Sequence, residues 1–262
     1  MDWLTSLPAG VLVGGWLLVA LLLAAAGRLV VGAVVPVGDH AGVLSIASPL
    51  MPALGATFAV MIAVTLSSEA GYLRSAHDVV SNEAEAASRL AWAATGPGIR
   101  TDPIHAALLD YLQSTRDAEW RGDSAANGDP ATQRTIKVLE GAVRTEAARA
   151  ELGTPASSEL LASLDGVTSY RRERLAAASR QIPVLYVVTL VAGGLALAVN
   201  AGALTIRSAL RTSLLVGGLA VVIGLSLALL FSLGAPWRGP LVVSGGPIDH
   251  VVADLQSGFF GF

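Results

Sequence analysis

The chain contains no cysteine and carries little charge for its length. Without a thiol, disulfides, thiolate catalysis and cysteine-ligated metals are excluded. Only 14% of the 262 residues are charged, whereas about 25% is usual for a soluble domain. The formal net charge is −3 and the basic residues are scattered, so nucleic acid is not an expected partner. The hydrophobic residues, 53% of the chain, gather in long blocks, which indicates a membrane protein.

Chemical motifs are also missing. No two of the four histidines share the helical spacing of metal ligands, and the chain has no nucleophile elbow, phosphate loop or dinucleotide fingerprint. Glu83 and Glu85 are two residues apart on a predicted helix and point about 160° away from each other. We expect one to pack inward against an arginine such as Arg89 and the other to be solvated. The sequence predicts no enzyme, no metal site and no cofactor.

Four apolar runs are long enough to cross a bilayer. Arg28 is the charge inside the first run, and we expect it to snorkel to the headgroups or to pair with a neighbouring helix, with a role in an ion path as the alternative. Gly10 and Gly14, four residues apart, would permit close helix packing. The runs cover roughly residues 9–35, 46–67, 182–204 and 213–234.

The second apolar run continues into a charged stretch without a glycine-proline break. Residues 48–92 therefore predict one helix of about 65 Å, twice the thickness of the hydrocarbon core. Three pairs of a capping residue and a proline, Asp102-Pro103, Asp129-Pro130 and Thr154-Pro155, predict helices near 103–120, 130–151 and 155–181. The last of these should run into the third apolar run with a kink at Pro183.

The predicted fold is an all-α membrane protein with four transmembrane helices and a helical cytoplasmic bundle inserted between spans two and three. Spans one and two occupy residues 1–67, the bundle 68–181, and spans three and four 182–234. The tail, 235–262, is expected at the membrane surface, with the surface of the bundle as the alternative. Near the span ends, six arginines lie on the side of the bundle against two or three on the other, which favours the cytoplasm.

Three stretches of the chain resemble a bacterial family of bestrophin-like membrane proteins. They are VVSNEAEAASRLAW with the following DYLQSTRDAEW, SYRRERLAAASRQIPVLYVVTL, and APWRGPLVVSGGPIDHVVADL. The resemblance implies a protein of the bacterial plasma membrane and an oligomer around a central pore, as in the chloride-permeable bestrophins. No acidic run resembles the calcium clasp, the calcium-binding segment of animal bestrophins, so we expect no gating by calcium. Within these stretches, the candidate charged or contact residues of the cytoplasmic bundle are Glu83, Glu119, Trp120, Arg171 and Arg238.

One face of the second span carries Phe58, Met61, Ile62, Thr65 and Glu69 at helical spacing. If a pore is present, we expect Phe58 and Ile62 to form its apolar neck and Thr65 a polar ring. The alternative is that this face packs against spans one and three. Glu69 argues against an anion path, because a ring of carboxylates favours cations.

Two functions follow from these observations. The first is a homo-oligomeric channel for small ions, with anions as one possibility. The second is a structural or accessory subunit that docks onto other subunits of a membrane complex, which suits the few polar residues of the spans and the pairs Gly193-Gly194 and Gly217-Gly218. A symmetric ring in mild detergent would favour the channel.

Overall fold

The structure is a computed structural model that describes residues 9–36, 38, 40–120, 123–180, 182–205, 210–234, 237 and 242–261. Every regular element within these ranges is a helix, which confirms the predicted all-helical class. The chain divides into two compact units. Unit 1 comprises Met1–Gly71, Gln181–Ala235 and Gly239–Leu241, and unit 2 comprises Tyr72–Arg180, Pro236–Arg238 and Val242–Phe262.

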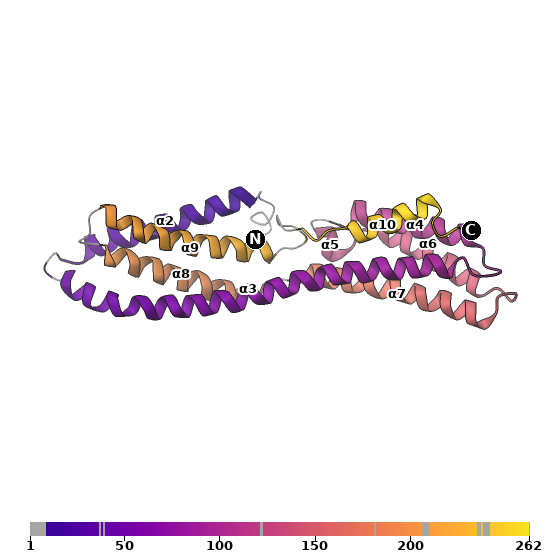
Figure 1. Cartoon of the computed structure of the whole chain (residues 1–262), viewed down its shortest axis with the longest axis horizontal. Helices are drawn as coiled ribbons and strands as arrows, with labels where there is room; N and C mark the ends of the chain where they lie inside the picture. The colour runs from indigo at the N-terminus through magenta and orange to yellow at the C-terminus, as the bar shows by residue number, and fades with distance from the viewer. Residues whose placement is uncertain are drawn as a thin grey trace. The chain divides into compact units, whose positions relative to one another are not determined.

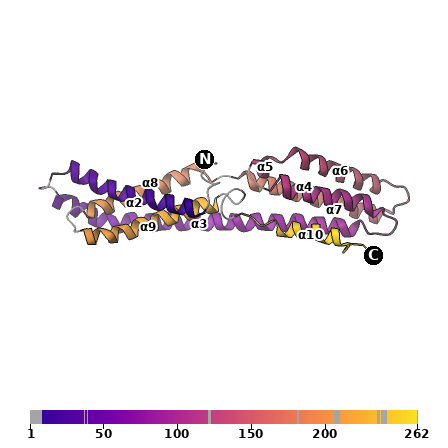
Figure 2. The ribbon, with the colours of Figure 1, turned by 90° about the horizontal axis from the view of Figure 1, so that it is seen from above.

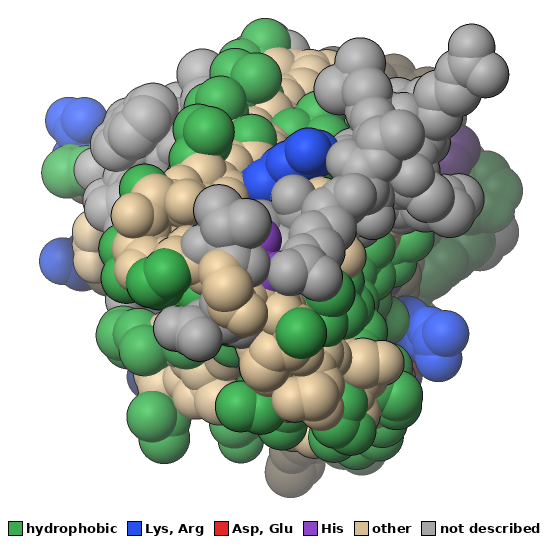
Figure 3. Space-filling view, turned by 90° about the vertical axis from the view of Figure 1, so that its left-hand side faces the viewer, with side chains coloured by type: hydrophobic (Ala, Val, Ile, Leu, Met, Phe, Trp, Pro, Cys, Tyr) green, Lys and Arg blue, Asp and Glu red, His purple; other side chains and the backbone are tan. Residues whose placement is uncertain are grey.

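Unit 1 contains four apolar helical segments that lie side by side (Figures 1 and 2). They are α2 (Ala9–Val34), the first part of α3 (His40–Ala93), α8 (Val184–Leu204) and α9 (Leu210–Leu233). By length and composition, three stretches could cross a membrane, Val13–Val34, His40–Ala93 and Thr154–Leu204, and Gly217–Leu233 is a shorter apolar helix. Hydrophobic side chains cover much of the described surface at the end of unit 1 where α2 precedes α3 (Figure 3).

Glycines bring the backbone of α2 against both α8 and α9. A Cβ at Gly202 of α8 would lie 2.7 Å from the carbonyl oxygen of Ala24, and one at Gly224 of α9 would lie 3.0 Å from the carbonyl oxygen of Trp16. Only glycine permits such an approach, because any side chain would push the helices apart. A Cβ at Gly10 or Gly14 would meet nothing within 4 Å, so the expected packing role of these two glycines is wrong within one chain.

The predicted continuous helix over residues 48–92 is confirmed, because α3 runs unbroken from His40 to Ala93. Its first part belongs to unit 1 and its second part to unit 2. Pro49 and Pro52 lie inside α3, since the helix begins at His40, before the expected start. A proline removes one backbone hydrogen bond, and membrane helices tolerate this loss.

The second part of α3 is joined in unit 2 by α4 (Thr101–Ala118), α5 (Asp123–Asn127), α6 (Pro130–Ala147), α7 (Thr154–Ser179) and α10 (Gly246–Ser257). Asp129 caps α6 as predicted, with its carboxylate accepting a hydrogen bond of 2.6 Å from the amide of Ala131. The other two predicted caps are wrong, because Asp102 and Thr154 lie inside α4 and α7. The residues before these helices are Arg100 and Gly153, and neither makes a side-chain capping hydrogen bond. Between α4 and α6, a stretch to which the sequence assigned no helix, the structure contains the short helix α5.

The predicted kink at Pro183 is instead a break. α7 ends at Ser179 and α8 begins at Val184; the backbone is extended at Arg180 and non-helical at Pro183, where ψ is 127°. A proline disfavours the helical conformation of the residue before it, which explains why the helix stops here.

The C-terminal segment packs against α4 within unit 2. Arg116 of α4 donates two hydrogen bonds to the carboxylate of Asp249, at 2.5 and 2.9 Å. The indole N–H of Trp120 donates to the carbonyl oxygen of Val243 at 3.2 Å. A Cβ at Gly245 would lie 2.2 Å from a guanidinium nitrogen of Arg116, so a side chain at this position would displace the guanidinium group of the ion pair. The helix of the tail therefore lies on the helical bundle, which was the alternative location for this segment.

Candidate functional site

The five residues proposed for a pore lie on the face of α3 that packs inside unit 1. Phe58, Ile62, Thr65 and Glu69 are buried, and Met61 is partly buried. The ring of Phe58 lies beside α8, where a Cβ at Gly194 would be 3.4 Å from its Cε2 atom. Phe58 and Ile62 share one apolar core with side chains of α8 and α9, namely Leu190, Leu197, Ala198, Ile223, Leu227 and Leu230.

These contacts agree with the alternative that this face packs against other spans and does not line a pore. The alternative named spans one and three, and the structure adds α9, the fourth apolar run. The hydroxyl of Thr65 donates to the carbonyl oxygen of Met61 at 2.8 Å, so it is satisfied within its own helix. In a single chain, Phe58 and Ile62 fill a core, and they would line a pore only if this packing changed.

Side chains on the opposite face of α3 are exposed among the described residues. Ala63 lies about 140° around the helix from Phe58, and Ser45 has the same angular position as Ala63. Within about 40° of Ala63 around the helix, the side chains of this small-residue face are exposed from Ser45 to Ser67 and none is larger than proline, and the exposed Val60 borders the face at about 60°. Its members are Ser45, Pro49, Pro52, Ala56, Ala59, Ala63 and Ser67.

Two charged side chains are described in unit 1. Arg28 is half-buried in α2, and its backbone amide faces Gly202 of α8, where a Cβ would lie 2.7 Å away. Glu69 is 3% exposed on the packed face of α3. Arg238, another candidate, lies outside the described residues.

Unit 2 contains a buried network of charged side chains centred on Arg174. Its Nε donates to Oε2 of Glu83 at 2.6 Å, and its Nη2 donates to Oε2 of Glu119 at 3.1 Å. The hydroxyl of Tyr111 donates to the other oxygen of Glu83 at 2.5 Å. All four side chains are fully buried. The network therefore connects α3, α4 and α7 through one guanidinium group.

Glu119 is held by a second arginine. Arg171 donates from Nη2 to Oε1 of Glu119 and from Nε to Oε2, the latter at 3.2 Å. Its Nη1 donates to the amide oxygen of Gln133 on α6 at 3.1 Å. The amide of Asp129 donates to Oε1 of Glu119 at 2.8 Å. The ring of Trp120 lies 5.7 Å from the guanidinium carbon of Arg174, within cation–π range.

This network unites four of the five candidate contact residues of the bundle, which are Glu83, Glu119, Trp120 and Arg171. Two carboxylates face two guanidinium groups, so the formal charge balances. Charges are almost never fully buried unless they are paired. The contacts of this network indicate a structural clamp between helices, because each carboxylate accepts two or more hydrogen bonds and is not left for acid-base chemistry.

The expectation for the glutamate pair of α3 is only partly correct. Glu83 points inward and Glu85 is solvated, but the inward residue pairs with Arg174. Arg89 instead pairs with Glu85 at 3.2 Å, and both side chains are at least two-thirds exposed. Arg89 lies four residues after Glu85 on the same face, a spacing that favours such a pair.

Two fully buried members of the network, Arg174 and Tyr111, were not among the candidates. Arg174 lies three residues after Arg171 on α7, and residues three apart lie on the same face of a helix. Its proximity to Arg171 could therefore have been predicted from the sequence. Tyr111 gives no such signal, because it is far from Glu83 in the chain. Burial raises the pKa of the Tyr111 phenol well above its usual value, and the negative charge of Glu83 raises it further. The phenol therefore remains a hydrogen-bond donor at neutral pH.

Another buried carboxylate of unit 2, that of Glu146 on α6, closes the turn between α3 and α4. Glu146 accepts hydrogen bonds from the backbone amide of Arg100 at 2.8 Å, from Nε of Arg100 at 2.9 Å and from Arg149 at 2.6 Å. Burial alone would raise the pKa of Glu146, but the hydrogen bonds from Arg100 and Arg149 outweigh it and lower the pKa. Arg149 also donates to the carbonyl oxygen of Gly98 in this turn, at 3.0 Å.

Long apolar helices in unit 1 and a paired-charge bundle in unit 2 define the class, which is an all-helical membrane protein. In the described ranges, no three histidine, aspartate or glutamate side chains group as metal ligands. The family model for the Bestrophin-like domain matches residues 18–248, which is most of the chain. The chain therefore belongs to the Bestrophin-like domain family. No curated protein and no solved structure matches it.

Proposed function

We propose that the protein is an oligomeric membrane channel for small ions, with its pore formed between copies of the chain. The observation that carries the proposal is the small-residue face of α3. It follows the apolar part of the helix, it has hydroxyl groups at both ends, and its side chains are exposed among the described residues. Helices with small side chains can approach one another closely. Around a shared axis, this face would line a narrow, largely apolar path with polar ends.

The packed core supports a path between copies over a path within one chain. Phe58 and Ile62 occupy the space between α3, α8 and α9. The proposed lining is therefore the opposite face from the one with Phe58 at its centre. Because Glu69 is on the packed face, it does not place a ring of carboxylates in this path. The permeant ion can accordingly be an anion.

The proposed topology has four spans, formed by α2, the first part of α3, α8 and α9. With four spans, both termini and the helices of unit 2 fall on the same side of the membrane. The excess of arginines near the span ends on that side favours the cytoplasm. We assign the protein to the bacterial plasma membrane, with no enzymatic activity and no cofactor.

Ion flux into proteoliposomes tests this function. The wild-type chain should carry halide flux above that of empty liposomes. Ala63→Phe, which places a large ring on the small-residue face, should reduce the flux at least tenfold. Val222→Phe on α9 is the matched control, because Val222 is 57% exposed and lies away from this face. Absence of flux for a range of anions and cations, or a monomer in mild detergent, would contradict the proposal.

A second candidate is an accessory subunit of a membrane complex. It is favoured by an exposed aromatic pair in unit 2, where the rings of Trp92 and Phe259 are 5.7 Å apart and 45% and 59% exposed. Exposed aromatic pairs are common at binding surfaces. A pull-down from native membranes that yields other subunits, and loses them with Trp92→Ala, would favour this function. Recovery of only this chain would weaken it.

A further inference from the structure

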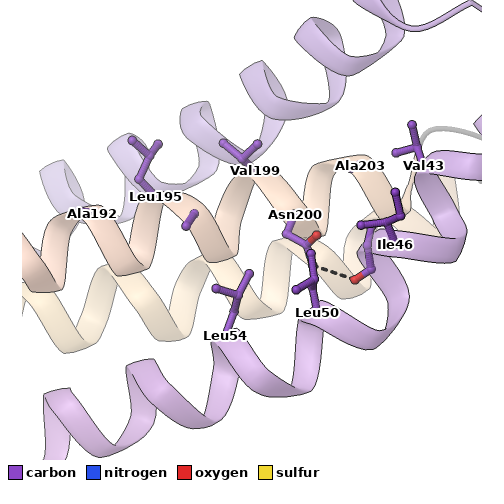
Figure 4. Close-up of a pocket in the computed structure, with 11 residues that line it drawn as sticks. Val43, Ile46, Leu50, Leu54, Ala192, Leu195, Val199, Asn200 and Ala203 are labelled. Carbon is purple, nitrogen blue, oxygen red and sulfur yellow. Dashed lines mark hydrogen bonds between the residues drawn. The ribbon is translucent and has the colours of Figure 1, made fainter.

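An apolar groove in unit 1 lies between α3 and α8 (Figure 4). Its volume is about 610 Å³, within the usual range of a small-molecule site. α3 contributes one wall, with Ile46, Leu50 and Leu54 among its residues. α8 contributes the other wall, from Ala192 to Ala203, and Asn200 is its single polar side chain.

The separation of α3 from α8 has a structural origin. Gly27 and Gly202 hold the backbone of α8 against α2, where a Cβ at Gly27 would lie 2.9 Å from the Cα of Val199. On the side of α3, the ring of Phe58 stands between the two helices beside Gly193 and Gly194. α8 is thus held close to α2 and spaced from α3 by a side chain. The groove is a consequence of these contacts.

Asn200 leaves one hydrogen-bonding atom available to a ligand in this groove. Its amide nitrogen donates to the carbonyl oxygen of Ala47 at 3.0 Å, the dashed line in Figure 4. It also contacts the sulfur of Met51 at 3.4 Å. The carbonyl of Ala47 can only accept, which fixes the orientation of the amide. None of the described residues donates to the amide oxygen of Asn200. A polar atom in an apolar membrane setting is unfavourable without a partner.

The dimensions of the groove match one leaflet of a bilayer. From Ala192 to Ala203 the wall of α8 is about 16 Å long at 1.5 Å per residue. Half of the hydrocarbon core is about 15 Å thick. Asn200 lies four residues before the end of α8 at Leu204, which places its amide about 6 Å from the helix end, near the headgroup level. The groove thus runs from the headgroup level toward the bilayer centre.

We propose that this groove binds one acyl chain of a membrane phospholipid, whose headgroup donates a hydrogen bond to the amide oxygen of Asn200. The acyl chain lies along the leucines of α3 and the small residues of α8. The donor is a hydroxyl or ammonium group, as in phosphatidylglycerol or phosphatidylethanolamine. This proposal depends on α3 and α8 crossing the bilayer and does not depend on channel activity.

Native mass spectrometry of the full chain in mild detergent, with defined lipids added, tests the site. The wild-type chain should retain one phospholipid per copy. Ala196→Phe fills the groove from α8, where Ala196 is exposed, and should lower lipid occupancy at least tenfold. Val222→Phe, an exposed position outside the groove, should leave occupancy unchanged. Equal lipid occupancy in the two variants would overturn the proposal.

The wild-type chain also tests the hydrogen bond without any core substitution. Phosphatidylcholine has no headgroup donor, so it should be retained about fivefold less than phosphatidylglycerol, as expected for one hydrogen bond. Asn200→Leu should remove this preference. Equal retention of both lipids by the wild-type chain would overturn the assigned role of Asn200. A change of oligomer mass in Ala196→Phe with lipid retained would show that a second copy fills the groove.

Discussion

Replacing Arg174 by methionine should destabilise the helices of unit 2 by about 3–5 kcal/mol, the usual effect of removing one partner from a buried ion pair. Its guanidinium group donates to Glu83 at 2.6 Å and to Glu119 at 3.1 Å, and it is fully buried. Methionine approximates the volume of the side chain but leaves the Glu83 carboxylate with Tyr111 as its remaining donor. Glu119 retains Arg171, so most of the loss should come from Glu83.

A double-mutant cycle measures the coupling free energy between Glu83 and Arg174. Glu83→Gln removes the charge and keeps an oxygen that can accept from Tyr111, and it should cost about 3 kcal/mol. The double variant should cost less than Arg174→Met alone, because no charge at position 83 is then left unpaired. The coupling energy should therefore be at least about 3 kcal/mol, at or above the upper end of the range for contacting residues.

Thermal unfolding in mild detergent, followed by far-UV circular dichroism, is a suitable assay. A loss of 3–5 kcal/mol corresponds to a fall in Tm of roughly 10–18 °C for a unit of this size. The exposed pair Glu85 and Arg89 on α3 provides the control, because Glu85→Gln should change stability by less than about 0.5 kcal/mol. Equal effects of Glu83→Gln and Glu85→Gln would refute the assignment of a buried clamp.

Three further predictions concern packing and pH. Gly202→Ala should destabilise the chain by about 1–3 kcal/mol, because its Cβ would lie 2.7 Å from the backbone of α2; Gly218→Ala, with nothing within 4 Å, should be neutral in the same melting experiment. The ionised Glu146 carboxylate should stabilise the wild-type chain at neutral pH, and this stabilisation should be lost as the pH falls below about 4.3 and through the lowered pKa of Glu146 in the folded state. Between pH 6 and pH 2, the free energy of unfolding should therefore fall less steeply with pH for Glu146→Gln than for the wild-type chain. Gly245→Ala should displace Arg116 and increase hydrogen exchange in α10.

Much of the helix content could be predicted from local patterns. The apolar-to-charged run gave the continuous α3, and Asp129-Pro130 marked the start of α6. The break at Pro183 was expected only as a kink, because the extended backbone at Arg180 has no signal besides the proline. The caps of α4 and α7 were harder to predict, because the proposed capping residues Asp102 and Thr154 are themselves part of these helices.

The candidate site depended on contacts between distant segments. Spacing placed Phe58, Ile62 and Thr65 on one face of α3, but it could not show that this face meets α8 and α9. Glycine spacing suggested Gly10 and Gly14, whereas the backbone contacts are made by glycines such as Gly202. Whether a glycine meets another helix depends on helix orientation, which is a tertiary property and cannot be obtained from spacing alone.

The central claim is that the small-residue face of α3 lines an ion path, and cysteine accessibility tests it most directly. The chain has no native cysteine, so Ala63→Cys and Ile62→Cys are single-thiol variants on the exposed and the packed face. A water-soluble, membrane-impermeant thiol reagent should block flux through proteoliposomes for Ala63→Cys and leave Ile62→Cys unaffected. Block at Ile62→Cys alone would place the path along the packed face and contradict the account.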